Sequence, residues 1–118
     1  MEKIFVFGSN LAGRHGAGSA RKALQSYGAI YGQGYGLQGK SFAIPTKDEE
    51  LKTLPLSRIE KYVQSFIKFA KLNPQLTFEV VRIGCGLAGY EDNEMAPLFK
   101  DAPMNCILPS GWRTHEGF

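Results

Sequence analysis

A cluster of glycines after an apolar segment is the feature of this sequence best suited to chemistry. Residues 79–83 have the pattern of a buried strand, and residues 84–90 contain three glycines. Because glycine lacks a β-carbon, such a loop can bring backbone N–H groups against an anion. Residues 91–94 then lead into an expected helix near residues 93–99, so the loop would lie at a helix N-terminus, where anions bind. A tight turn without a ligand has the same spacing.

A second glycine-rich loop also lies between a strand and a helix. Residues 3–7 predict a buried strand, and glycines at 13, 16 and 18 precede a helix that Gly28 is expected to end. Small residues at 17–20 would let that helix lie close to a sheet or to a ligand. The buried face expected for it consists of Ala17, Ala20, Leu24 and Tyr27. The candidate ligand-binding residues of the two loops are Asn10, His15, Gly16, Ala17, Gly18, Ser19, Gly84, Cys85, Gly86, Leu87, Ala88, Gly89 and Tyr90.

One reactive side chain, Lys47, follows a strand expected over residues 41–46. Ligands of open α/β sheets gather at the carboxyl ends of strands, which favours a contact with the ligand. A solvated lysine beside Asp48 and Glu49 is the alternative.

Residues 34–41 match the P-loop pattern GxxxxGK[ST] letter for letter. That pattern binds nucleotide phosphates only between a strand and a helix. Here an apolar segment with Pro45 follows, which predicts a strand instead, so a P-loop nucleotidase is the unfavoured alternative. The dinucleotide-binding fingerprint is also absent, because the first glycine loop reads GxxGxG without an acidic residue at the end of a second strand.

The remaining segments predict an α/β domain with helices on both faces of a mixed, mostly parallel sheet. The strongest helix pattern begins near Leu56 and ends at Asn73-Pro74, with a capping box expected at residues 57–60. Strands are expected over residues 76–83 and 105–108, and Trp112 is expected to dock on the domain. The apolar stripe of that helix consists of Leu56, Ile59, Val63, Phe66, Ile67 and Ala70.

Composition limits the classes of function. The 118 residues predict a single domain over residues 1–118, and a net charge of +3 is too mild and dispersed for a nucleic-acid surface. Cys85 and Cys106 are isolated in apolar segments, so neither a metal site nor a disulfide framework is expected, and a cytoplasmic location fits best. No apolar segment approaches the length of a membrane span. We expect no cofactor and no membrane partner.

Three segments together resemble the macrodomain family. RIGCGL at residues 82–87 is similar to the same segment in the branch that includes terminal ADP-ribose protein glycohydrolase, HGAGSA at 15–20 resembles its MGAGIA loop, and IPTK at 44–47 resembles its ITK strand end. The similarity spans roughly residues 3–108. It implies a three-layer α/β/α sandwich that binds ADP-ribose, with the two glycine loops around the diphosphate and the distal ribose.

The resemblance also implies roles for single residues. Asn10 matches the asparagine that orients the ribose, and Lys47 matches the lysine that attacks C1″ of the distal ribose. The family's aspartate directly after GCGL is replaced by Ala88, and Glu91 and Asp92 are the nearby carboxylates that would have to substitute. We therefore expect binding of ADP-ribose or an ADP-ribosylated substrate, nucleic acid only if ADP-ribosylated, with slow glycohydrolase activity or non-catalytic sequestration or sensing as the alternatives.

Overall fold

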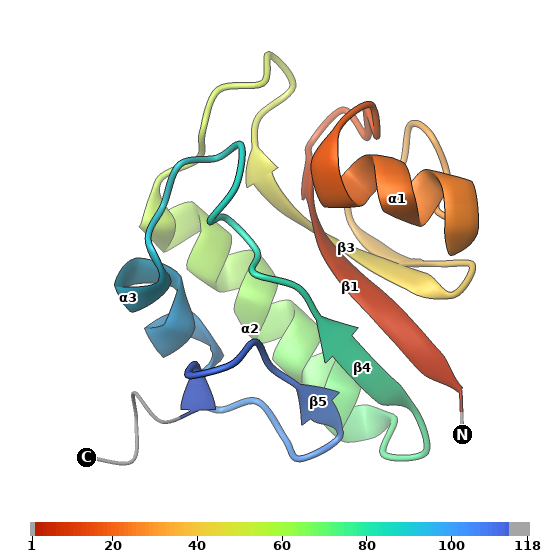
Figure 1. The fold of residues 1–118 in the computed structure, drawn as a ribbon, viewed down its shortest axis with the longest axis vertical. Coiled ribbons are helices and arrows are strands. Elements are labelled where there is room, and N and C mark those ends of the chain that lie inside the picture. The colour runs from red at the N-terminus through yellow and green to blue at the C-terminus, as the bar shows by residue number, and fades with distance from the viewer. Residues whose placement is uncertain (1, 114–118) are drawn as a thin grey trace.

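A computed structural model describes residues 2–113 as an α/β domain built on a mixed sheet (Figure 1). The sheet has five strands in the order β2-β3-β1-β4-β5, and all neighbours are parallel except β2 and β3. The prediction of a mixed, mostly parallel sheet is confirmed. The elements are β1 (Lys3–Asn10), α1 (Gly18–Ser26), β2 (Gly36–Gln38), β3 (Ser41–Lys47), α2 (Leu56–Leu72), β4 (Thr77–Val80), α3 (Asp92–Met95), the 3-10 helix η1 (Ala96–Phe99) and β5 (Cys106–Ile107).

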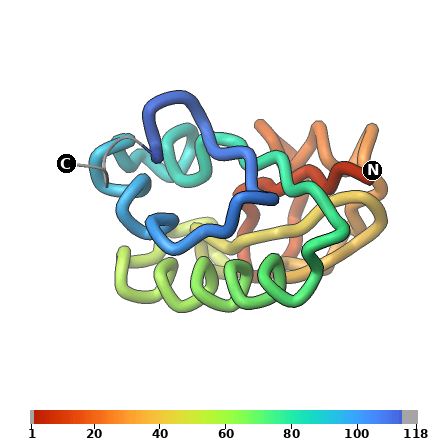
Figure 2. The backbone as a smooth tube through the Cα atoms, turned by 90° about the horizontal axis from the view of Figure 1, so that it is seen from below, coloured from red at the N-terminus to blue at the C-terminus, as the bar shows by residue number. Residues whose placement is uncertain are grey.

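The central strand β1 separates two groups of buried side chains. Ile4 and Val6 belong to the larger core, which includes the buried residues of α2, whereas Phe5 and Phe7 belong to a smaller core with the alanines of α1. Successive side chains of a strand point to opposite faces, so α1 and α2 cover different faces. Figure 2 shows the two helices on either side of the sheet.

The stripe predicted for α2 is confirmed, with its buried residues at Ile59, Val63, Phe66, Ile67 and Ala70. The capping box predicted at residues 57–60 is wrong, because the N-cap of the helix is Pro55, two residues before Ser57, and it provides no side-chain cap. The face predicted for α1 is partly wrong. Its buried residues are Ala20 and Ala23, and Leu24 is exposed, since a helix placed so close to the sheet buries only small side chains.

The P-loop match at residues 34–41 forms a β-hairpin. Strand β2 pairs antiparallel with β3, and Gly39 takes a φ of +58° in the turn between them. A strand therefore follows the pattern where a nucleotide-binding P-loop needs a helix. Strand β2 was not among the predicted elements, because its three residues lie in a glycine-rich segment without an apolar pattern.

Two elements near the C-terminal end are shorter than predicted. Strand β4 ends at Val80, three residues before the predicted end, and the expected helix near 93–99 is divided into α3 and η1. Pro97 lies in the first turn of η1, where its missing N–H interrupts α-helical hydrogen bonding. The predicted docking of Trp112 is confirmed, since its side chain is 1% exposed and its ring lies 5.3 Å from that of Phe99.

Side chains donate hydrogen bonds to backbone carbonyl oxygens at both edge strands of the sheet. At β2, Gln33 Nε2 donates hydrogen bonds of 3.1 Å to the carbonyl oxygens of Tyr35 and Leu37. At β5, the Arg113 guanidinium donates to the carbonyl oxygen of Cys106 at 2.7 Å and to that of Pro103 at 2.8 Å. In the described part of the chain, no helix is long and apolar enough to cross a membrane.

Candidate functional site

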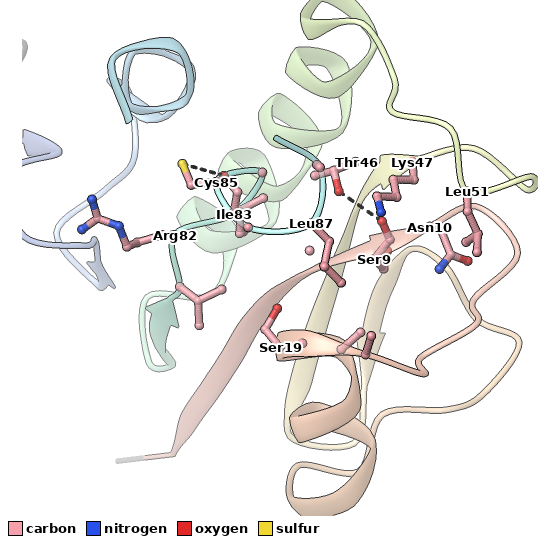
Figure 3. Close-up of a pocket in the computed structure, with 18 of the residues that line it drawn as sticks. Ser9, Asn10, Ser19, Thr46, Lys47, Leu51, Arg82, Ile83, Cys85 and Leu87 are labelled. Atoms are coloured by element: carbon pink, nitrogen blue, oxygen red, sulfur yellow. Dashed lines mark hydrogen bonds between the residues drawn. The ribbon is translucent and has the colours of Figure 1, made fainter. Parts of the chain in front are cut away.

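A cavity of about 630 Å³ opens at the carboxyl ends of β1, β3 and the segment after β4 (Figure 3). This is the place where ligands of open α/β sheets bind, and the volume lies in the range of small-molecule sites. The two glycine loops predicted from the sequence meet around it. Its lining consists of Gly8, Ser9, Asn10, Arg14, Gly16, Ala17, Gly18, Ser19, Ala20, Thr46, Lys47, Leu51, Val81, Arg82, Ile83, Gly84, Cys85, Gly86, Leu87 and Ala88.

The first glycine loop is closed by the side chain of Asn10. Its Oδ1 accepts a hydrogen bond of 2.9 Å from the backbone N–H of Arg14, and its Nδ2 donates one of 2.9 Å to the Arg14 carbonyl oxygen. Asn10 is therefore both a lining residue and the clamp that shapes the loop. Gly18 begins α1 with a φ of +58°, a conformation that favours glycine.

The second glycine loop faces the first across the cavity. A β-carbon built at Gly18 would lie 3.6 Å from Cδ1 of Leu87, so this leucine reaches from one loop to the other. Leu87 itself is 69% exposed. The loop is also tied to the segment after β3, because Thr53 Oγ1 donates a hydrogen bond of 3.0 Å to the Ala88 carbonyl oxygen.

Both loops carry backbone N–H groups that make no hydrogen bond to any other described residue. These groups belong to residues 16–20 in the first loop and to residues 86–88 in the second, and all eight residues line the cavity. Those of 18–20 are the orphan donors of the first turn of α1, where the helix dipole also favours negative charge. Such an arrangement can receive an anion from two sides.

The charged side chains of the lining are all cationic. Arg14, Lys47 and Arg82 line the cavity, and none of its described lining residues is an aspartate or glutamate. Figure 3 shows Lys47 beside Ser9 and Asn10, and it shows Arg82 on the opposite side, pointing away from these residues. Lys47 forms no ion pair with a described residue, whereas Arg82 pairs with Asp92. The cavity therefore offers positive charge without a carboxylate that could act as a base.

Five of the candidate site residues lie outside the cavity lining, and each of them has a hydrogen-bond partner. His15, a candidate ligand-binding residue of the first loop, is completely buried, and its Nε2 lies 3.2 Å from Gln38 Oε1. The hydroxyl of Tyr90 donates a hydrogen bond of 2.6 Å to the Leu54 carbonyl oxygen. Glu91 is the N-cap of α3, in a reciprocal capping box with Glu94. The other two are Gly89 and Asp92.

Asp92 is the acceptor of a small cluster behind the second glycine loop. Its carboxylate accepts hydrogen bonds from the Arg82 guanidinium, from the Trp112 indole N–H at 2.8 Å and from Cys85 Sγ at 3.6 Å. The Trp112 indole N–H, followed by the charge of Arg82, holds the pKa of Asp92 below its ordinary value. This carboxylate is ionised at neutral pH, and its partners lie away from Lys47.

The Cys85 thiol lines the cavity but is a poor nucleophile. Burial raises its pKa to about 11, and the negative charge of Asp92 adds to the effect. Only the thiolate form of cysteine reacts, so this residue stays protonated at neutral pH. The prediction that Cys85 and Cys106 are free is confirmed.

The sequence analysis missed lining residues that have no characteristic motif. Arg14 lies between Gly13 and Gly16 of the first loop, so its cationic type was the available signal. Leu51 lines the cavity with a φ of +65°, the one positive value among the described non-glycine residues. Such strained residues cluster at binding sites, but nothing in the local sequence predicts this one.

Comparison with known proteins gave no match, whether with family models, with curated proteins or with solved structures. Among residues 2–113, no group of three or more histidine, cysteine, aspartate or glutamate side chains is arranged to hold a metal ion. The site is therefore interpreted from its own geometry.

Proposed function

We propose that this domain binds ADP-ribose, or a related ADP-ribosyl nucleotide, in the cavity between its two glycine loops. The observation that carries the proposal is the set of unpartnered N–H groups at residues 16–20 and 86–88, which flank one cavity lined by three cations and no described carboxylate. A diphosphate presents anionic oxygens to both loops at once, and charge-assisted hydrogen bonds to such oxygens are strong. The macrodomain resemblance and a three-layer arrangement belong to the same proposal.

The cavity geometry favours binding over catalysis. Lys47 lines the cavity, as a nucleophile for C1″ would, but Glu91 caps α3 and Asp92 is held by Arg82 and Trp112. Neither carboxylate lines the cavity, so neither is available to take a proton from the lysine. Sequestration or sensing is therefore the primary proposal, and slow hydrolysis through Lys47 is the secondary one.

Parallel calorimetric titrations with ADP-ribose and AMP test the binding proposal. ADP-ribose is expected to bind more tightly, because AMP carries one phosphate and lacks the distal ribose, so it cannot engage both loops. Equal affinities for the two nucleotides would contradict a site built for a diphosphate.

The variant Ala88→Asp tests whether hydrolysis is limited by the missing carboxylate. Ala88 lines the cavity together with Lys47, so an aspartate there would supply a base near the amine. Release of ADP-ribose from an ADP-ribosylated peptide is expected to be faster in this variant than in the parent. Fast release by the parent that persists in Lys47→Ala would refute the lysine mechanism.

A further inference from the structure

We propose that Asp92 is a positioning residue for ligand binding, which holds the second glycine loop in place through Arg82 and Cys85 and fixes that loop to Trp112. The inference rests on the proposed function, since it concerns the same cavity. It assigns Asp92 a role different from the catalytic one implied by the resemblance.

The contacts of Asp92 join the start of the second glycine loop to Trp112, which lies twenty residues further along the chain. Oδ2 accepts a hydrogen bond from the Arg82 guanidinium and Oδ1 accepts one from the Cys85 thiol. The carboxylate therefore contacts the residue two positions before the loop and a residue near the start of the loop. Oδ1 also accepts the Trp112 indole N–H at 2.8 Å. Trp112 packs against Phe99 in the larger core, so its indole N–H is a fixed donor for the Asp92 carboxylate.

Asp92 itself lies on a fixed support. It is the first residue of α3, whose N-terminus is closed by the capping box of Glu91 and Glu94. The next turn carries Met95, which is completely buried, and its Sδ would lie 2.8 Å from a β-carbon at Gly84. The helix therefore packs directly against the start of the loop that Asp92 holds.

Apart from Asp92, the loop is attached to other segments by the bonds from Thr53 Oγ1 to the Ala88 carbonyl oxygen and from the Tyr90 hydroxyl to the Leu54 carbonyl oxygen. Its internal bonds are those from the N–H of Gly89 to the Gly86 carbonyl oxygen and from the N–H of Tyr90 to the Gly84 carbonyl oxygen. The N–H groups of residues 86–88 are unpartnered within the described chain. A ligand that binds these groups must find them ordered, and ordering a loop on binding costs affinity. By holding Arg82 and Cys85 beforehand, Asp92 lowers that cost.

The matched variants Asp92→Asn and Asp101→Asn test the inference by calorimetric titration with ADP-ribose. Both remove one negative charge, but Asp101 is exposed and lies outside the cavity lining. Asp92→Asn is expected to weaken binding about tenfold through loss of the ordered loop, while Asp101→Asn keeps the parent affinity. Circular dichroism establishes that each variant is folded.

The single tryptophan of the chain provides a spectroscopic readout. Because the proposal places Asp92 against the indole N–H before the ligand binds, Trp112 emission of the unliganded protein is expected to be the same in the parent and in Asp101→Asn and to differ in Asp92→Asn. If Asp92→Asn does not fold, Trp112→Phe keeps an aromatic ring against Phe99 and removes the indole N–H; weaker binding is then the expected result.

The outcomes separate the two proposals. If the parent does not bind ADP-ribose, the proposed function fails and the positioning role fails with it. If the parent binds and Asp92→Asn binds equally well, or if Trp112 emission of unliganded Asp92→Asn equals that of the parent, the positioning role alone is overturned.

Discussion

The variant Gly86→Val separates a ligand-binding loop from a simple turn. Gly86 lies outside the left-handed region, and a β-carbon built there has no protein atom within 4 Å. Backbone strain is therefore not the reason to expect an effect. Because Gly86 lines the cavity, the valine would instead occupy space beside the unpartnered N–H groups of residues 86–88.

The expected loss of affinity follows from the hydrogen bonds that the valine would block. A hydrogen bond to a charged group contributes about 1.5–3 kcal/mol, so loss of two such bonds to a phosphate costs about 3–6 kcal/mol. Binding of ADP-ribose is then weaker by at least about 100-fold. Stability should change little, because the new side chain displaces no protein atom, and a substitution of this kind stays within about 0.5 kcal/mol.

Calorimetric titration and thermal unfolding measure the two effects separately. Gly16→Val is the matched variant on the opposite loop, since a β-carbon there also has no protein atom within 4 Å and Gly16 also lines the cavity. Both variants are expected to fold and to lose affinity. A folded Gly86→Val protein that binds ADP-ribose as the parent does would show that the second loop is only a turn.

Three further predictions concern charge, packing and pH. Lys47→Ala should weaken ADP-ribose binding about 10- to 100-fold in calorimetry with an unchanged melting temperature, since it removes a cation without a described ion-pair partner, and equal affinity would contradict this. Gly34→Ala should destabilise the fold by more than about 3 kcal/mol in urea titrations, because its β-carbon would lie 2.3 Å from the Asn10 carbonyl oxygen, and parent-like stability would refute the packing there. Burial raises the pKa of Cys85 and Cys106 from 9.0 to about 11, so the folded state retains protons that the unfolded chain releases. The free energy of unfolding should therefore fall as pH rises from about 9 to about 11, and it should fall less in Cys106→Ala than in the parent. A free energy of unfolding that does not change over this range would contradict the raised pKa of the two thiols.

The parts of the fold that could be predicted are those that follow from local periodicity. The stripe of α2 and the apolar segments of β1 and β3 agree with the structure, because burial of a face imposes a regular spacing. Pro97 divided one expected helix, and the glycine-rich segment around β2 concealed a strand. In both places the outcome depends on backbone hydrogen bonds that a hydrophobic pattern does not contain.

The candidate site was predictable as two loops but not as a set of contacts. The glycines placed both loops at one cavity, since strand ends of a parallel sheet share an edge. Which side chains face that cavity depends on partners far away in sequence. His15 is buried beside Gln38, and the Asp92 carboxylate accepts a hydrogen bond from Trp112, which lies twenty residues further along the chain. No local pattern carries that information.

The occupied edges of the sheet bear on how this protein can associate with others. A peptide or a second copy that extends the sheet must form main-chain hydrogen bonds with an open strand. At β2 such a strand would have to displace Gln33, and at β5 it would have to displace the Arg113 guanidinium. Strand addition is thereby disfavoured at both ends, as is the edge-to-edge aggregation that exposed strands invite.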